Sequence, residues 1–197
     1  MRTMSKYPSE LETRHGLPED LKILIAKYPR EVWQGHENLG QVAQFWLQRH
    51  DMFREMGGIL TGAISDWRED RTDAMEFAGF FMPRLNWFLG NLDGHHNIED
   101  HHYFPVFRNA EQRLARGFDI LDGDHDIIHS ALEANANAAN GFAAAIKKGG
   151  DALKFAGDSY QKENERLITM LMRHLEDEED LIIPVILDQS ESKLGIS

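Results

Sequence analysis

The chain of 197 residues contains no cysteine. Disulfide bonds, iron–sulfur clusters, thiolate zinc sites and a cysteine nucleophile are therefore excluded. Long apolar runs are also missing, because stretches such as Ala78–Pro83 and Leu181–Leu187 are far shorter than the roughly 20 residues that span a bilayer. Leu21–Ala26 contains Lys22 and follows no basic segment, so we expect no secretory signal and a cytoplasmic protein.

Positive charge is scarce as well. The sequence has 21 lysines and arginines against 33 aspartates and glutamates, which gives a formal net charge of −12. This balance argues against nonspecific binding to nucleic acid or to an anionic membrane surface. With 42% hydrophobic residues, a chain of this length suits one domain with a full-sized core.

Alternation of the kind found in β-strands is absent, whereas apolar residues recur at helical spacing. The spacing predicts four long helices, over about 39–65, 72–107, 118–148 and from Asp151 or Asp158 to Leu187. Pro83 predicts a start, a break or a kink within the second helix, and Gly149-Gly150 predicts the end of the third. Long helices with short connections favour an all-α fold, an antiparallel up-down four-helix bundle.

The two ends of the chain differ from the bundle. Residues 1–38 are polar and interrupted by prolines and glycines, which predicts an irregular N-terminal arm packed on the bundle. Within this arm, Leu21–Tyr28 is expected to form a short helix that acidic residues open. We expect the bundle itself over residues 39–188 and a C-terminal tail over residues 189–197.

One pattern, His-x-x-x-Glu followed six residues later by Pro, occurs twice at a separation of 79 residues. The residues that share this offset are His95 and His174, Glu99 and Glu178, Pro105 and Pro184, and the further pair His50 and His129. Side chains four residues apart lie on one face of a helix, so each motif can reach the same ion or ion pair. Imidazole and carboxylate bind borderline first-row metals, and the repeat therefore predicts a metal site.

A second pair four residues apart, His125 and His129, adds to the repeat. The predicted ligand set is His50, His95, Glu99, His125, His129, His174 and Glu178. One tetrahedral zinc requires fewer ligands, and a magnesium or calcium site would not use five histidines. The set matches two five- or six-coordinate irons bridged by the carboxylates and a solvent oxygen, although manganese and zinc accept the same donors.

Several alternatives stay open at single positions. His125, between two aspartates, also fits an exposed helix start, and the 79-residue offset selects His129 if only one of the two binds. His96 and His101 are expected to face outward, because their counterparts at that offset are not ligands. Hydrogen-bond partners for the second ring nitrogen of bound histidines are expected among Asp51, Asp100, Asp124 and backbone carbonyls.

His50, the run His95–Pro105, the run Asp124–His129 and His174-x-x-x-Glu178 together resemble the hemerythrin-like, or HHE cation-binding, domain over about residues 39–188. The resemblance implies a four-helix bundle that holds a non-haem di-iron centre. It implies that one iron is held by His125, His129 and His174. The other would be held by His50 and His95, with Glu99 and Glu178 bridging and an open position on this second iron.

The resemblance has one departure on the last helix. Oxygen-carrying hemerythrins have His-x-x-x-x-Asp there, whereas this chain has Glu178 at the fourth position and Glu179, an alternative ligand, at the fifth. A site rich in histidine favours reversible binding or sensing of a small ligand, dioxygen first, with nitric oxide or peroxide as options. Ferritin-like oxygenases use more carboxylates and Glu-x-x-His motifs.

Two further functions remain as alternatives. One is a di-iron oxidoreductase that acts on nitric oxide or peroxide, and the other is iron storage or iron–sulfur cluster repair. Repair relatives often carry an extra cysteine-bearing N-terminal region, which the sequence lacks. We assign no catalytic residue from the sequence.

Overall fold

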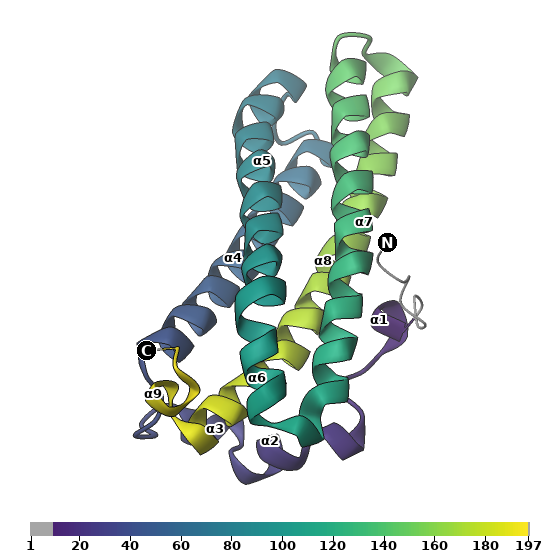
Figure 1. The fold of residues 1–197 in the computed structure, drawn as a ribbon. Helices are drawn as coiled ribbons and strands as arrows, with labels where there is room; N and C mark the ends of the chain where they lie inside the picture. The colour runs from purple at the N-terminus through teal and green to yellow at the C-terminus, as the bar shows by residue number, and fades with distance from the viewer. Residues whose placement is uncertain (1–9, 197) are drawn as a thin grey trace.

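The structure is a computed structural model that describes residues 10–196, and over these residues every regular element is helical. Four long helices extend through the molecule: α4 (Gln41–Arg68), α5 (Ala74–Ile98), α7 (Ala115–Ile146) and α8 (Gly150–Gln189) (Figure 1). The predicted all-α class is confirmed. Additional short helices precede, connect and follow the four long ones, so the description by four helices is incomplete.

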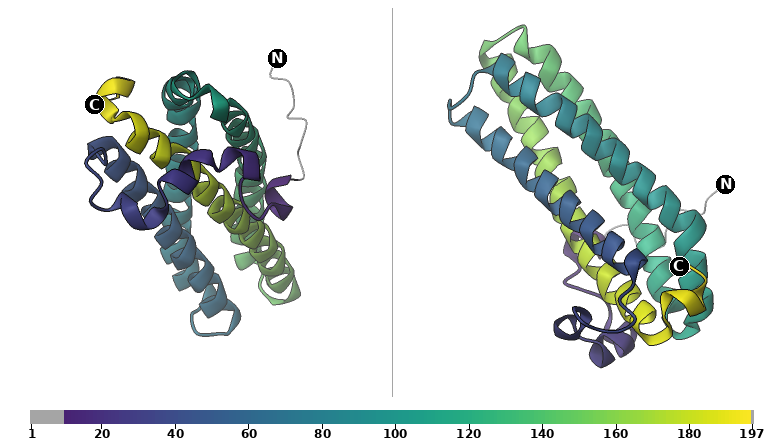
Figure 2. Two further views of the ribbon diagram at one scale, coloured as in Figure 1. Left: turned by 90° about the horizontal axis from the view of Figure 1, so that it is seen from below. Right: turned by 90° about the vertical axis from the view of Figure 1, so that its left-hand side faces the viewer.

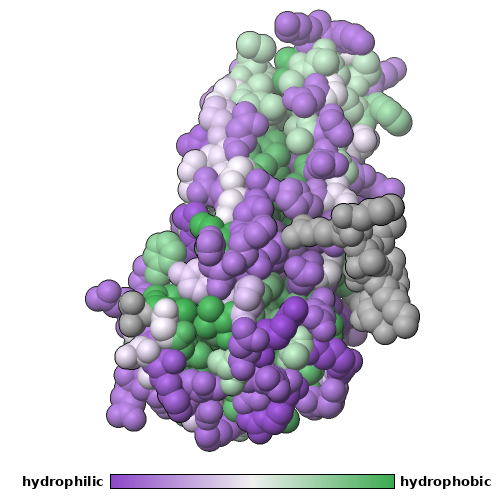
Figure 3. Space-filling view, viewed as in Figure 1, coloured by the Kyte–Doolittle hydropathy of each residue, from purple (hydrophilic) through white to green (hydrophobic). Residues whose placement is uncertain are grey.

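The long helices surround a common interior. α4 and α7 each pack against both α5 and α8. The turns from α4 to α5 and from α7 to α8 lie at the same end of the molecule, as Figures 1 and 2 show. None of the described helices has the length and apolar character needed to cross a membrane. The face in Figure 3 is mostly hydrophilic, with hydrophobic residues visible chiefly in the middle of its upper half and in its lower part.

Apolar residues three or four positions apart explain why these segments are helices that pack together. The buried residues of α4 are Ala43, Trp46, His50, Phe53, Gly57, Leu60 and Ile64. Those of α5 are Phe77, Phe81, Leu85, Phe88, Leu92 and His96. Such spacing places one stripe of each helix against the core.

The second long helix ends differently from the prediction. α5 continues through Pro83, whose flanking residues Phe81 and Leu85 are both 1% exposed and anchor the helix in the core. The helix is interrupted instead after Ile98, where Glu99–Tyr103 (η2) forms a π-helical turn before α6 (Phe104–Ala110). A short 3₁₀ turn, η3 (Gln112–Leu114), then leads into α7.

Short helices from the N-terminal segment pack on α8. They are α1 (Glu10–Thr13), η1 (Glu19–Leu21), α2 (Ile23–Lys27) and α3 (Arg30–Trp33), and α1, α2 and α3 each contact α8. The expected helix at residues 21–28 is present as η1 and α2. Leu17, Leu21, Leu24 and Trp33 join the apolar core at this end. The first nine residues of the predicted arm lie outside the described residues.

The C-terminal segment also contacts the bundle. After α8, the short helix α9 (Glu191–Leu194) packs against α6 and α8. Glu191 Oε1 accepts a hydrogen bond of 2.8 Å from the backbone N–H of Ala43, in the first turn of α4. A carboxylate at this position satisfies an amide that has no partner within its own helix.

Candidate metal centre

Buried polar side chains form a layer between two apolar clusters of the core. One cluster contains Phe53, Leu92, Ile128 and Leu175, and the other contains Trp46, Phe104, Leu121 and Leu181. Between them along the four helices are His50, His96, Glu99, His125, His174 and Glu178, each at most 2% exposed. Burial of so many ionisable groups is costly unless they are paired or bind a metal.

The donor atoms of this layer fall into two groups. One consists of His96, His125 and His174, and the other of His50, His95, Glu99 and Glu178. Within each group, one donor atom per residue lies within 4.8 Å of all the others. The histidines thus divide into three and two, on opposite sides of a pair of carboxylates.

The two glutamates join the groups. Glu99 has Oε1 at 2.8 Å from His95 Nε2 and Oε2 at 3.6 Å from His125 Nε2. Glu178 has Oε1 at 3.4 Å from His50 Nε2 and Oε2 at 3.2 Å from His174 Nε2. Each carboxylate therefore directs one oxygen to the two-histidine group and the other oxygen to the three-histidine group, as a bridging carboxylate does.

Distances between ring nitrogens also fit shared ions. Nε2 of His50 lies 3.2 Å from Nε2 of His95, and Nε2 of His125 lies 3.1 Å from Nε2 of His174. Nitrogens bound at about 2.1 Å to one first-row ion lie roughly 3.0–3.4 Å apart when the angle between them is about 90–110°. The side chains are thus already spaced as ligands of a common ion would be.

Several buried donor atoms have no hydrogen-bond partner in the described part of the chain. They are both ring nitrogens of His96, both carboxylate oxygens of Glu99 and Oε2 of Glu178. Leaving such atoms without a partner is destabilising, by about 1–3 kcal/mol for each group. A metal pair would satisfy the inward-facing atoms, so the residues present fit the metal centre that the resemblance implies.

Three of the histidines bond to a carboxylate through the ring nitrogen that faces away from the layer. The pairs are His125 Nδ1 with Asp100 at 2.7 Å, His50 Nδ1 with Glu179 at 3.0 Å and His174 Nδ1 with Asp124 at 3.4 Å. Such partners fix ring orientation and direct the other nitrogen to a metal. Asp100 and Asp124 were expected in this role, whereas Asp51 bonds to Arg54 instead.

The pKa values of the buried histidines shift in different directions. Burial lowers the pKa of His95 to about 3 and holds that of His96 well below its usual range. For His174, burial acts in the same direction, but Asp124 and Glu178 outweigh it and raise the pKa to about 9. Against burial, Glu178 and Glu179 likewise raise the pKa of His50, so the layer contains histidines shifted towards the neutral form beside two shifted towards the charged form.

His129 is not brought to this layer. Its side chain is 47% exposed, and its Nε2 lies 2.8 Å from Oδ1 of Asp93. The buried stripe of α7 includes Leu121, His125 and Ile128, and His129 follows Ile128 by one residue, about 100° around the helix. The prediction that His129 lies in the buried site is therefore wrong, and the structure brings His125 to the layer instead.

His96 occupies the place in the layer that was predicted for His129. It is 1% exposed, and its ring stacks on that of His125 with centroids 3.9 Å apart. It was expected to face outward because its counterpart at the 79-residue offset is not a histidine. That expectation is wrong, since the side chain is buried. A signal was present in the spacing, since His96 follows Phe88 and Leu92 on the buried stripe of α5.

The π-helical turn determines which residues of the next segment face the layer. Along this stretch the buried positions are His96, Glu99, Phe104 and Phe107. The step of five from Glu99 to Phe104 is the spacing of a π turn. Consequently His101 is exposed, whereas the ring of Phe104 packs on that of His125 with centroids 5.2 Å apart.

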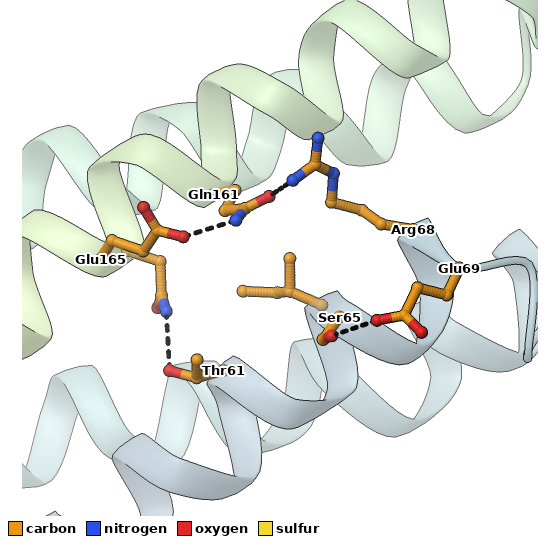
Figure 4. A pocket seen from close by; sticks show the side chains of 8 residues that line it. Thr61, Ser65, Arg68, Glu69, Gln161 and Glu165 are labelled. Atoms are coloured by element: carbon orange, nitrogen blue, oxygen red, sulfur yellow. Dashed lines mark hydrogen bonds between the residues drawn. The ribbon is translucent and has the colours of Figure 1, made fainter.

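A cavity of about 380 Å³ opens between α4 and α8 away from the polar layer (Figure 4). Thr61, on its wall, is eleven residues beyond His50 on α4, a rise of about 16 Å. Its polar groups bond to one another, as in the contacts of Ser65 with Glu69 and of Gln161 with Glu165. The lining includes no residue of the two donor groups, so this cavity is separate from the metal centre.

The fold and the buried donors define a helical, cation-binding type of protein. The family described as the hemerythrin HHE cation binding domain matches residues 41–186. Because this match covers most of the chain, the protein belongs to the hemerythrin HHE family, and the resemblance found in the sequence is confirmed. Comparison with curated proteins and with solved structures gave no match.

Proposed function

We propose that the protein is a hemerythrin-like antiparallel four-helix bundle that holds two iron ions and reversibly binds or senses a small ligand, dioxygen first. The observation that carries this proposal is that Glu99 and Glu178 each reach from one histidine group to the other. The proposed ligands of one ion are His96, His125 and His174, those of the other are His50 and His95, and both glutamates are shared.

The unequal division of histidines indicates where a small ligand would bind. When bound, ferrous ions would supply the electrons that dioxygen requires. The group of His50 and His95 has one histidine fewer, so it leaves room for an external ligand. Phe53 lies against His95, with ring centroids 5.2 Å apart, and the ring of Trp46 is 6.1 Å from the same histidine. These apolar neighbours exclude water from that side.

Trp46 has a second role at the same place. Its Nε1–H donates a hydrogen bond of 2.5 Å to Oε1 of Glu178, and both side chains are buried. A donor fixed in the core holds the carboxylate in one rotamer, so the two oxygens stay directed at the two histidine groups. Trp46 thus positions a bridging ligand while its ring contributes to the apolar wall.

The test is the metal content and visible spectrum of protein loaded with ferrous iron without oxygen and then exposed to air. Two irons per chain and an absorption band that appears with oxygen and disappears on its removal would support the proposal. Irreversible oxidation of two irons would instead favour a redox enzyme or iron handling. Failure of the protein to bind iron would overturn the assignment.

Substitution of the shared carboxylates tests the ligand set. Glu99→Ala and Glu178→Ala are expected to reduce bound iron from two ions towards one or none, because each removes a ligand from both ions. Glu165→Ala, on the wall of the cavity in Figure 4, is the matched control and should retain two. Two irons in both ligand variants would contradict the assignment.

A further inference from the structure

The N-terminal segment contacts a carboxylate that orients one histidine of the three-histidine group. Arg14 donates from Nη1 to Oδ1 of Asp124 at 3.2 Å and also pairs through Nη2 with Oδ2. From Nε it donates to Oδ2 of Asp177 at 2.8 Å. Asp124 is in turn the partner of His174 Nδ1. A continuous chain of contacts therefore leads from Arg14 to a proposed iron ligand.

A second arginine of the same segment reaches the other group. Arg30 donates from Nη1 to Oε2 of Glu179 at 2.7 Å and from Nε to Oδ1 of Asp180 at 2.8 Å. Glu179 Oε1 bonds to His50 Nδ1. The sequence offered Glu179 as an alternative metal ligand, whereas its contacts make it the outward partner of a histidine.

The contact of Arg14 is sheltered from water, whereas the Arg30 side chain is 43% exposed and meets a buried carboxylate. The side chain of Arg14 is 9% exposed, and those of Asp124 and Glu179 are 4% and 2% exposed. Charge-assisted hydrogen bonds in such places are stronger than on the surface, and the fork of arginine fixes a carboxylate in two directions. Arg14 and Arg30 both precede residues 41–186, the part of the chain that matches the family.

We propose that Arg14 and Arg30 are positioning residues for the metal centre, with Arg14 acting on the ion of the three-histidine group and Arg30 on the ion of the two-histidine group. Each arginine fixes a carboxylate, and that carboxylate fixes the ring of a histidine ligand. This inference rests on the proposed metal assignment. It gives the N-terminal segment a function beyond covering the end of the bundle.

The two arginines differ in whether their carboxylate has another arginine as a partner. Both oxygens of Asp124 bond to Arg14, so loss of this arginine leaves a buried carboxylate without its cationic partner. Glu179 has a second cation, because Arg54 donates to its Oε1 at 2.7 Å. Arg14→Ala should therefore disturb its ion more than Arg30→Ala disturbs the other.

The experiment measures the release of ferrous iron to a coloured chelator, without oxygen, from protein loaded with two irons. Outward partners of metal-bound histidines contribute about 10–100-fold to affinity. Arg14→Ala is expected to release one iron about 10-fold or more faster and to leave the release of the other unchanged. Arg30→Ala should accelerate the other iron by a smaller factor, and the double variant should accelerate both.

A matched control separates positioning from general anchoring of the segment. Arg166 donates to Glu12 Oε1 at 2.7 Å and so attaches the same segment to α8 without touching a histidine partner. Arg166→Ala should leave both release rates unchanged. Thermal unfolding of the metal-free variants supplies a second readout. Loss of anchoring alone would lower the unfolding midpoints of Arg14→Ala, Arg30→Ala and Arg166→Ala without changing iron release.

Arg14→Lys keeps a charge beside Asp124 and serves if Arg14→Ala does not fold. It should still release one iron faster, because lysine lacks the fork that spans both oxygens. Unchanged release from the arginine variants, or equal acceleration in Arg166→Ala, would overturn the inference while the two-iron assignment stands. Absence of iron from the unmodified protein would overturn both.

Discussion

Glu99 and Glu178 are both buried, yet their pKa values shift in opposite directions. Burial and the neighbouring Glu178 raise the pKa of Glu99 well above its ordinary value. Burial acts on Glu178 in the same way, but His50 and His174 outweigh it and hold its pKa well below the ordinary value. In the absence of metal, a proton on the pair is therefore held by Glu99 in preference to Glu178.

Metal binding at neutral pH should therefore release protons. Glu99 must lose its proton to act as a ligand, and so must His174, whose pKa is raised to about 9. Apparent affinity should consequently rise with pH up to about 9. Calorimetric titration with ferrous iron in buffers of different ionisation enthalpy measures the number of protons released. Net uptake of protons on binding would contradict the expected protonation states.

The proposal that His96, and not His129, is a metal ligand is directly testable. His96→Ala should reduce bound metal from two ions to about one, because it removes a ligand from the three-histidine group. His129→Ala, matched in residue type and exposed at the surface, should retain two ions. Metal content per chain after loading and desalting is the measurement. The opposite result would favour the set expected from the sequence repeat.

Removal of metal should destabilise the protein without unfolding it. The apolar clusters on both sides of the polar layer remain packed, whereas the layer keeps partnerless atoms such as those of His96. A free ion concentration 100 times the dissociation constant should stabilise the fold by about 2.7 kcal/mol. Circular dichroism should show helices in both forms and a higher unfolding midpoint with metal. Loss of helicity on chelation would instead indicate folding that depends on metal.

A pair of glycine substitutions tests the packing of the end remote from the metal centre. A Cβ on Gly157 would lie 2.3 Å from ring atoms of Trp67, so Gly157→Ala should destabilise the fold by about 1–3 kcal/mol. Gly62→Ala meets nothing within 4 Å and should stabilise α4 by about 0.5–1 kcal/mol. Denaturant unfolding measures both. Equal changes in the free energy of unfolding would contradict the close contact between Gly157 and Trp67.

Much of the fold could be predicted because the spacing of apolar residues along the sequence indicates helices. The stripes that contain Phe53 on α4 and Phe88 on α5 are visible in the sequence, and so are the glycines that end α7. At Pro83 the helix neither starts nor breaks, since burial of its neighbours outweighs the local preference of proline. The contacts of α1, α2 and α3 with α8 depend on distant partners and could not be read from local pattern.

The repeat predicted residues of α4, α5 and α8 that meet in the layer, but on α7 it pointed to His129, whereas His125, which is off the repeat, lies in the layer. His50, His95 and His174 lie on the repeat and meet in the layer, but the repeat does not describe which residue of α7 turns inward. Glu179 shows the same limit, because its contacts with His50 and Arg30 depend on three separate segments. Spacing predicts a shared face, whereas rotation of one helix against another needs the structure.

The π-helical turn at Glu99–Tyr103 has a consequence for insertions and deletions in this chain. A regular α-helix would carry the inward stripe from Glu99 to His102 or Tyr103, whereas the extra residue delays it to Phe104. Regular winding with every residue kept would rotate His102 or Tyr103 towards the interior, whereas deletion of one residue within the turn would leave Phe104 four positions after Glu99 and keep both facing inward. The turn is therefore a place where the chain can lose one residue while the residues on both sides of it continue to face the polar layer.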